Sequence, residues 1–139
     1  MKTLFLILLS VVAQQQFSQT IKPVDFKELR GTYVNKVNTT KDGKVYNGIK
    51  CKDTITFFND GKFRWGYCKG PLTGDWKIDA PQKKLILYNK KSKYLENLLK
   101  TKDLGISEIE VKELNKKQMI LIVYDEALGA IDQLFIRIK

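Results

Sequence analysis

Histidine is missing from this 139-residue sequence, and its absence excludes several kinds of chemistry. Without an imidazole the chain has no Ser–His or Cys–His nucleophile pair, no histidine acid or base, and no ordinary zinc site. No glycine-rich phosphate-binding loop occurs either. Two acidic pairs, Asp125 with Glu126 and Glu108 with Glu110, fit carboxylate catalysis or calcium binding, but both are expected at strand ends and outward faces. The sequence therefore predicts a protein that is not an enzyme and has no cofactor and no metal.

Arginine is scarce in a chain that is otherwise strongly basic. The formal net charge is +10, yet arginine occurs only at Arg30, Arg64 and Arg137. Arginine reads bases and phosphates better than lysine does. The lysines are scattered over expected turns and outward strand positions, where they keep a sheet soluble and protect its edges. We therefore expect a monomer with no nucleic-acid partner, and an anionic envelope surface remains a candidate partner.

Only one long apolar run is present, and it lies near the first residue. Lys2 precedes an apolar stretch over residues 3–13, which is followed by three glutamines, the order typical of a secretory signal peptide. Cleavage after Ala13 or after Ser18 fits the small-residue rule, and the second is preferred. We therefore predict a signal peptide over residues 1–18, export to the periplasm or beyond the cell, and a mature domain over 19–139 without a transmembrane segment.

Cysteine occurs only at Cys51 and Cys68. An even number of cysteines in an exported protein usually forms disulfides. Pairing Phe57 with Phe63 across the intervening turn leaves the two cysteines one residue out of register. A β-bulge near Gly66 corrects this, because one extra residue flips the alternation of faces. We predict a Cys51–Cys68 disulfide, the alternative being two separate buried thiols.

What is present is a series of short stretches in which apolar and polar residues alternate. The clearest covers residues 53–78, where the alternation continues on both sides of a turn at residues 59–61. Further strands are expected over residues 32–40, 45–49, 84–88, 109–112, 119–124 and 133–139. About eight strands spaced about ten residues apart predict an all-β fold, either a sandwich or an up-and-down antiparallel barrel. The hairpin-like connections favour the barrel.

Three segments carry other expectations. The apolar spacing over residues 23–30 predicts a short N-terminal helix that ends at Gly31. Residues 89–105 fit either a helix or a strand with a long loop, and the helix is preferred. Pro71 is expected to bound a loop over residues 69–72, because proline donates no N–H to a strand ladder.

The order of four motifs resembles the bacterial lipocalin-like domain family, which consists of small exported proteins of the Bacteroidota. The motifs lie at residues 29–33, 55–63, 74–78 and 109–121. The sequence departs from the family at Tyr33, where the family has tryptophan, so a buried Tyr33 hydroxyl needs a hydrogen-bond partner. The resemblance implies an up-and-down barrel with a short N-terminal helix and, at most, the binding of a small apolar ligand.

The inward-facing aromatic residues of the expected barrel are the candidate binding residues. They either fill the barrel or line a cavity, and the sequence leaves both open. For a small hydrophobic or amphipathic ligand, the candidates are these aromatic residues with two arginines placed to meet an acid group, namely Tyr33, Phe57, Phe63, Trp65, Trp76, Arg64 and Arg137. The alternative is an interaction module with a filled barrel, which contacts a protein or an anionic envelope glycan through its basic surface.

Overall fold

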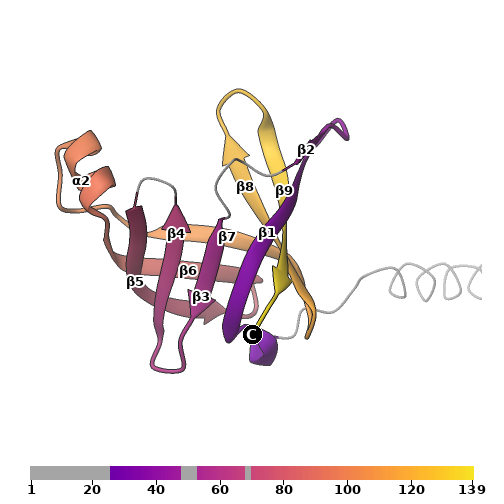
Figure 1. Cartoon of the computed structure of the whole chain (residues 1–139), viewed down its shortest axis with the longest axis horizontal. Helices are drawn as coiled ribbons and strands as arrows, with labels where there is room; N and C mark the ends of the chain where they lie inside the picture. Colours follow the sequence, from indigo (N-terminus) through magenta and orange to yellow (C-terminus); the bar gives the residue numbers. More distant parts are fainter. Residues whose placement is uncertain (1–25, 48–52, 68–69) are drawn as a thin grey trace, which may run out of the picture.

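The computed structural model describes residues 26–47, 53–67 and 70–139 (Figure 1). These residues form one 3-10 turn, nine strands and one α-helix: η1 (Phe26–Glu28), β1 (Gly31–Thr40), β2 (Val45–Asn47), β3 (Thr54–Phe57), β4 (Lys62–Tyr67), β5 (Gly70–Asp79), β6 (Lys84–Lys91), α2 (Lys93–Leu99), β7 (Ser107–Leu114), β8 (Gln118–Asp125) and β9 (Gly129–Arg137). No helix in this part of the chain is both long and apolar enough to span a membrane.

Eight of the strands form a closed antiparallel barrel. Strands β3 to β9 pair in chain order, and β1 closes the ring by pairing with β3 on one side and β9 on the other. The short strand β2 pairs with β1 over Val37–Thr39, beyond the stretch Gly31–Val34 that pairs with β3. The predicted up-and-down antiparallel barrel of about eight strands is therefore confirmed.

The apolar residues of alternating strands meet inside the barrel. Phe57 lies opposite Phe63, as the turn between them predicts, and Trp76 lies opposite Leu87. The largest fully buried side chains come from all around the ring and include Tyr33, Ile55, Phe63, Leu85, Leu87, Val111, Met119, Leu121 and Phe135. Since each such side chain stabilises the fold by about 1.5–3 kcal/mol when it leaves water, this interior decides which face of each strand points inward.

The predicted N-terminal helix is not found in the described residues. A single 3-10 turn, η1, stands in its place, and the Leu29 N–H donates to the Phe26 carbonyl oxygen at 3.2 Å. The chain then enters β1 at Gly31, whose φ is +132° and where an added Cβ would come within 2.5 Å of the Lys139 carbonyl oxygen. One turn suffices to bury Leu29 completely. So short an apolar segment gains too little burial to offset the cost of starting a longer helix.

The helix preferred within residues 89–105 is present as α2, Lys93–Leu99. The Ser92 hydroxyl accepts a hydrogen bond from the Leu95 N–H at 3.2 Å, and the Glu96 carboxylate accepts one from the Ser92 N–H at 3.1 Å. These reciprocal bonds fix the start of the helix. The helix ends at Lys100, which has a left-handed φ of +53°.

The prediction of a loop around Pro71 is wrong. Strand β5 begins at Gly70, and Pro71 lies opposite Gly66 of β4. Pairing of β5 with β6 begins only at Thr73, so the proline lies where β5 has a neighbour on one side. A proline is tolerated near the start of a strand under these conditions, because its missing N–H interrupts no ladder on that side.

The predicted signal peptide and both cysteines lie outside the described residues, so the Cys51–Cys68 disulfide stays a prediction. The bulge predicted near Gly66 does fall on described residues. There β3 and β4 pair without a shift from Phe57 opposite Phe63 to Thr54 opposite Gly66. The described part of this ladder therefore contains no bulge at Gly66.

Candidate functional site

Most of the predicted aromatic binding residues belong to the core. The exposed fractions of Tyr33, Phe57, Phe63 and Trp65 are 0%, 2%, 1% and 6%. Phe57 makes edge-to-face contacts with Tyr33 and with Trp76, at ring-centre distances of 6.1 and 5.8 Å. Trp65 makes a similar contact with Phe135 at 6.2 Å. These aromatic rings pack on one another, which is how residues that fill a barrel behave.

Arg137 lies over the ring of Tyr33, with its guanidinium carbon 5.0 Å from the ring centre. Its Nη2 donates to the Tyr33 hydroxyl, which in turn donates to the Leu29 carbonyl oxygen at 2.9 Å. The hydroxyl that tyrosine adds at this position therefore has its partners. The cluster joins the η1 turn to β1 and β9, where the barrel closes, and charge-assisted bonds of this kind are stronger than neutral ones.

Arg64 lies elsewhere, on the outer face of the barrel. It is exposed, and its pairing partners are Thr56 on β3 and Thr73 on β5. Residues paired across strands point to the same side of a sheet, and the neighbours Phe63 and Trp65 point to the other side. The seven residues predicted as a binding site are therefore not brought together around one cavity.

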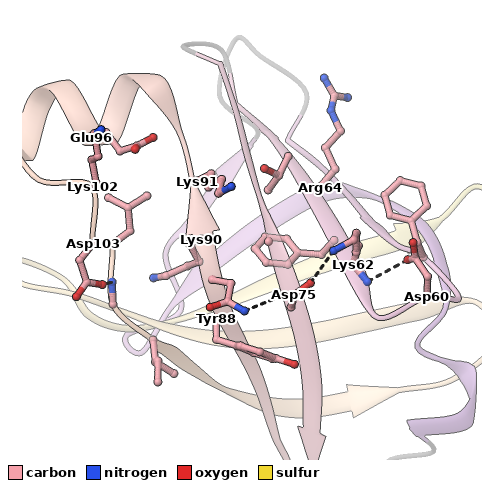
Figure 2. Close-up of a pocket in the computed structure, with 18 residues that line it drawn as sticks. Asp60, Lys62, Arg64, Asp75, Tyr88, Lys90, Lys91, Glu96, Lys102 and Asp103 are labelled. Carbon is pink, nitrogen blue, oxygen red and sulfur yellow. Dashed lines mark hydrogen bonds and ion pairs between the residues drawn. The ribbon is translucent and has the colours of Figure 1, made fainter.

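A groove of about 1530 Å³ lies on the outside of the barrel (Figure 2). Its floor consists of two rows of paired residues that cross β4, β5 and β6, namely Lys62–Asp75–Tyr88 and Arg64–Thr73–Lys91. One wall is formed by Glu96 of α2 and by residues 102–106, and Phe58 lines the groove from the β3–β4 turn. In Figure 2 Lys102 lies on the side of α2, and Lys62 and Arg64 lie on the opposite side.

A β-bulge in β6 shapes the floor of the groove. Asn89 and Lys90 together lie opposite Gly74, because Tyr88 pairs with Asp75 and Lys91 with Thr73. Asn89 has a left-handed φ of +49°, which asparagine tolerates better than most residues. An added Cβ at Gly74 would come within 2.7 Å of the Tyr88 carbonyl oxygen, so only glycine allows β6 to approach this closely. The bulge brings Lys91 onto the same outer face as Tyr88.

The acidic side chains of the groove are occupied by neighbours. Asp75 accepts hydrogen bonds from the Asn89 side-chain amide at 2.8 Å and from Lys62 Nζ at 3.1 Å, and these partners lower the pKa of the Asp75 carboxyl. The Asp103 carboxylate accepts from the Gly105 N–H at 2.9 Å. Asp60 accepts from the Lys62 N–H at 3.2 Å, and Glu96 belongs to the helix cap described above.

The basic side chains of the groove differ from one another. Lys90 Nζ donates to the Ser107 hydroxyl at 2.6 Å, and partial burial lowers the pKa of its ammonium group. Lys91 acts on Asp75 only through its charge. Within the described residues, the side chains of Arg64, Lys91 and Lys102 make no hydrogen bond and no ion pair. Three cations thus face the groove without a hydrogen bond or ion pair to any described residue, which makes the groove attractive to an anionic group.

Apolar side chains lie beside these cations. Phe58 and Ile106 are 43% and 70% exposed, and the partly buried Leu104 packs against the core from the same wall. A pocket that combines apolar surface with a few placed charges suits an amphipathic molecule. Among the described residues, no group of three or more acidic or cysteine side chains is arranged to hold a metal ion.

A solved structure of a lipocalin-like protein from Bacteroides uniformis is similar to this chain, with a TM-score of 0.54 over 79% of this chain and 98% of that one. The fold is lipocalin-like. The two sequences are 13% identical, so the similarity concerns the fold alone. No protein-family model matches the sequence, and no curated protein matches it either.

In this lipocalin-like barrel the outer groove contains residues that the sequence analysis did not predict as binding residues. From the sequence, Lys91 and Lys102 look like ordinary exposed lysines. Simple alternation along the strand predicts that Lys91 lies on the face opposite Tyr88. One local signal was present, since Asn89 tolerates the left-handed backbone that a bulge requires. The groove also needs the chain from α2 to β7 to stand beside β5, which no local pattern indicates.

Proposed function

We propose that this protein is an exported, non-catalytic binding protein whose site is the outer groove, and that its ligand is a small amphipathic molecule with an anionic group. The observation that carries the proposal is a set of three cations beside exposed apolar side chains, Arg64, Lys91 and Lys102, whose side chains make no hydrogen bond or ion pair in the part of the chain that the structure describes. We place the ligand here because the aromatic residues inside the barrel pack against one another.

The two floor rows suggest how such a ligand would sit. Arg64 and Lys91 flank Thr73 in one row, so an anionic head group above Thr73 is within reach of two cations and a hydroxyl. The apolar part of the ligand would lie against Leu104 and Ile106 on the wall. Arginine and lysine side chains bind anionic groups well, which supports a role in binding.

Laurate and dodecanol test this proposal, because they share an apolar chain and differ in charge. We expect laurate to bind the full chain in calorimetric titrations. The triple variant Arg64→Gln, Lys91→Gln, Lys102→Gln should bind laurate at least about tenfold more weakly, because a hydrogen bond to a charged group contributes about 1.5–3 kcal/mol. Dodecanol binding should change little in the same variant.

The matched control is Lys36→Gln, Lys41→Gln, Lys116→Gln, which removes three charges from exposed lysines outside the groove. This control should keep wild-type laurate affinity. Equal loss of affinity in both triple variants would show that net charge alone attracts laurate and would contradict the groove as the site. Unchanged affinity in the groove variant would contradict it as well.

The second candidate is an interaction module that contacts an anionic envelope glycan through the same cations. It is supported by the packed aromatic interior and by the cations of the groove, and it needs no apolar contact. Binding of a sulfated polysaccharide that falls steeply with salt, together with laurate binding that is absent, would favour this candidate.

A further inference from the structure

The helix α2 lacks the buried face that most surface helices have. None of its seven residues is buried, and Leu98 and Leu99 are 61% and 59% exposed. Ile106, just before β7, is 70% exposed. Leu95 is the helix residue that packs against the core. Figure 1 shows α2 standing away from the barrel, beyond the ends of β5 and β6. Adjacent exposed leucines on a projecting helix indicate a contact surface.

The segment that contains this apolar tip is rich in lysine. Residues 90–103 contain five lysines and two carboxylates, Glu96 and Asp103, which gives a net charge of +3. Both carboxylates are occupied, since Glu96 accepts from the Ser92 N–H and Asp103 from the Gly105 N–H. Lys93 and Lys100 stand at the two ends of the helix and are exposed. The projecting tip therefore combines apolar side chains with positive charge on both sides.

We infer that α2 and its flanking lysines form a docking surface for a lipid bilayer that contains anionic phospholipid. Leu98 and Leu99 would enter the boundary between head groups and acyl chains, and Lys93 and Lys100 would meet lipid phosphates. The positive charge complements an anionic surface. A projecting apolar tip also fits a bilayer, which accepts side chains from above and does not require a matching concave partner.

This inference goes beyond the proposed function, because docking through α2 does not require a ligand in the groove. Docking through α2 would place the proposed ligand binding at a membrane surface. Glu96 and residues 102–106 form one wall of the groove, so a molecule docked through α2 would hold the groove close to the lipid surface. A binding protein in this position would exchange an amphipathic ligand with the membrane over a short distance.

Vesicle co-sedimentation of the full chain tests the docking surface. The probes are vesicles of phosphatidylcholine with and without phosphatidylglycerol. We expect Leu98→Ser, Leu99→Ser to lower the partition onto phosphatidylglycerol vesicles about tenfold, because it removes the apolar tip. Lys93→Gln, Lys100→Gln should lower it by a similar factor, because each lysine near an anionic surface contributes about 1 kcal/mol. Residues 1–18 are present in every variant and in every control, so each comparison is between chains that carry the same residues there.

Two matched controls make the test specific. Val45→Ser, Tyr46→Ser removes an apolar pair of β2 that is 58% and 45% exposed, and Lys41→Gln, Lys116→Gln removes two exposed charges elsewhere. Both controls should keep wild-type partition. Equal partition of the α2 variants and the controls would overturn the inference. So would the finding, by sedimentation velocity, that Leu98→Ser, Leu99→Ser dissociates a dimer while vesicle binding is unchanged, because a second copy would then be the occupant.

The proposal for the groove and the inference for the docking surface can be contradicted independently. Lys91 and Lys102 line the groove and also belong to the lysine-rich segment, whereas Arg64 lies on β4, and Lys93 and Lys100 do not line the groove. Loss of laurate binding in Arg64→Gln with normal vesicle partition would leave the docking inference intact. Loss of vesicle partition in the α2 variants with normal laurate binding would leave the proposed function intact.

Discussion

The closing side of the barrel and the groove side use their arginines in opposite ways. Where β1 meets β9, Arg137 stacks on Tyr33 and donates to its hydroxyl, and that hydroxyl donates to the Leu29 carbonyl oxygen. On the outer face of β4, Arg64 is exposed, and its side chain makes no hydrogen bond or ion pair within the described residues. The comparison separates a polar side chain that contacts other parts of the fold from one that makes no hydrogen bond or ion pair in the described residues.

Two carboxylates have opposite pKa shifts, although both accept hydrogen bonds from neighbouring side chains. Burial raises the pKa of Asp53, against the smaller effect of the hydrogen bond that Trp65 Nε1 donates to it at 2.5 Å. The pKa of Asp75 in the groove is lowered by Asn89 and Lys62. Asp53, just before β3, is therefore harder to ionise than an ordinary aspartate, whereas Asp75 is easier to ionise. Opposite pKa shifts imply opposite pH dependences.

The largest expected difference between the two sides is in stability. Arg137→Ala removes a charge-assisted bond and a stacked guanidinium, so we expect the free energy of unfolding to fall by about 2–3 kcal/mol. Arg64→Ala changes an exposed side chain and should shift it by less than about 0.5 kcal/mol. Urea denaturation of both variants measures the difference. Equal losses would show that Arg64 has a structural role and would remove the contrast.

A smaller effect is expected in the pH dependence of stability. For Asp53 the folded pKa is raised, so its contribution to stability is present below its ordinary pKa and is lost as the pH rises through the raised value. Asp53→Asn should therefore stabilise the protein near pH 7, relative to wild type, and the gain should disappear at acidic pH.

Asp75 should behave in the opposite way. Its folded pKa is lowered, so its contribution is present above the ordinary value and is lost as the pH falls through the lowered one. Asp75→Asn should destabilise the protein at neutral pH, and the loss should vanish on acidification. Urea denaturation from acidic to neutral pH measures both variants against wild type. Parallel pH profiles for the two variants would contradict the assignment of the two carboxylates.

Much of the barrel follows from local patterns in the sequence. The turn at residues 59–61 predicts that Phe57 pairs with Phe63, and the helical spacing after β6 predicts α2, because both depend on near neighbours. The N-terminal helix and the loop at Pro71 were wrong for a related reason. Each was inferred from local propensity, whereas the packing of Leu29 and the position of Pro71 beside β4 depend on distant strands.

The candidate site could not be predicted in the same way. Tyr33 and Arg137 are separated by 104 residues and meet only because β1 and β9 close the ring. The groove depends on the bulge opposite Gly74. Without this bulge, strict alternation along β6 would place Lys91 on the inner face, and with it Lys91 lies on the outer face. Four of the predicted binding residues, Tyr33, Phe57, Phe63 and Trp65, are buried in the core, while the cations of the groove were found from the three-dimensional arrangement.

Arginine side-chain NMR during a laurate titration tests the contrast between the two sides most directly. The sequence contains only Arg30, Arg64 and Arg137, so single substitutions suffice to assign every guanidinium signal. We predict that the Arg64 signal moves as laurate binds, because its guanidinium meets the anionic group, and that the Arg137 signal stays in place on Tyr33. Movement of the Arg137 signal with a stationary Arg64 signal would contradict the account and would place the ligand at the closing side of the barrel.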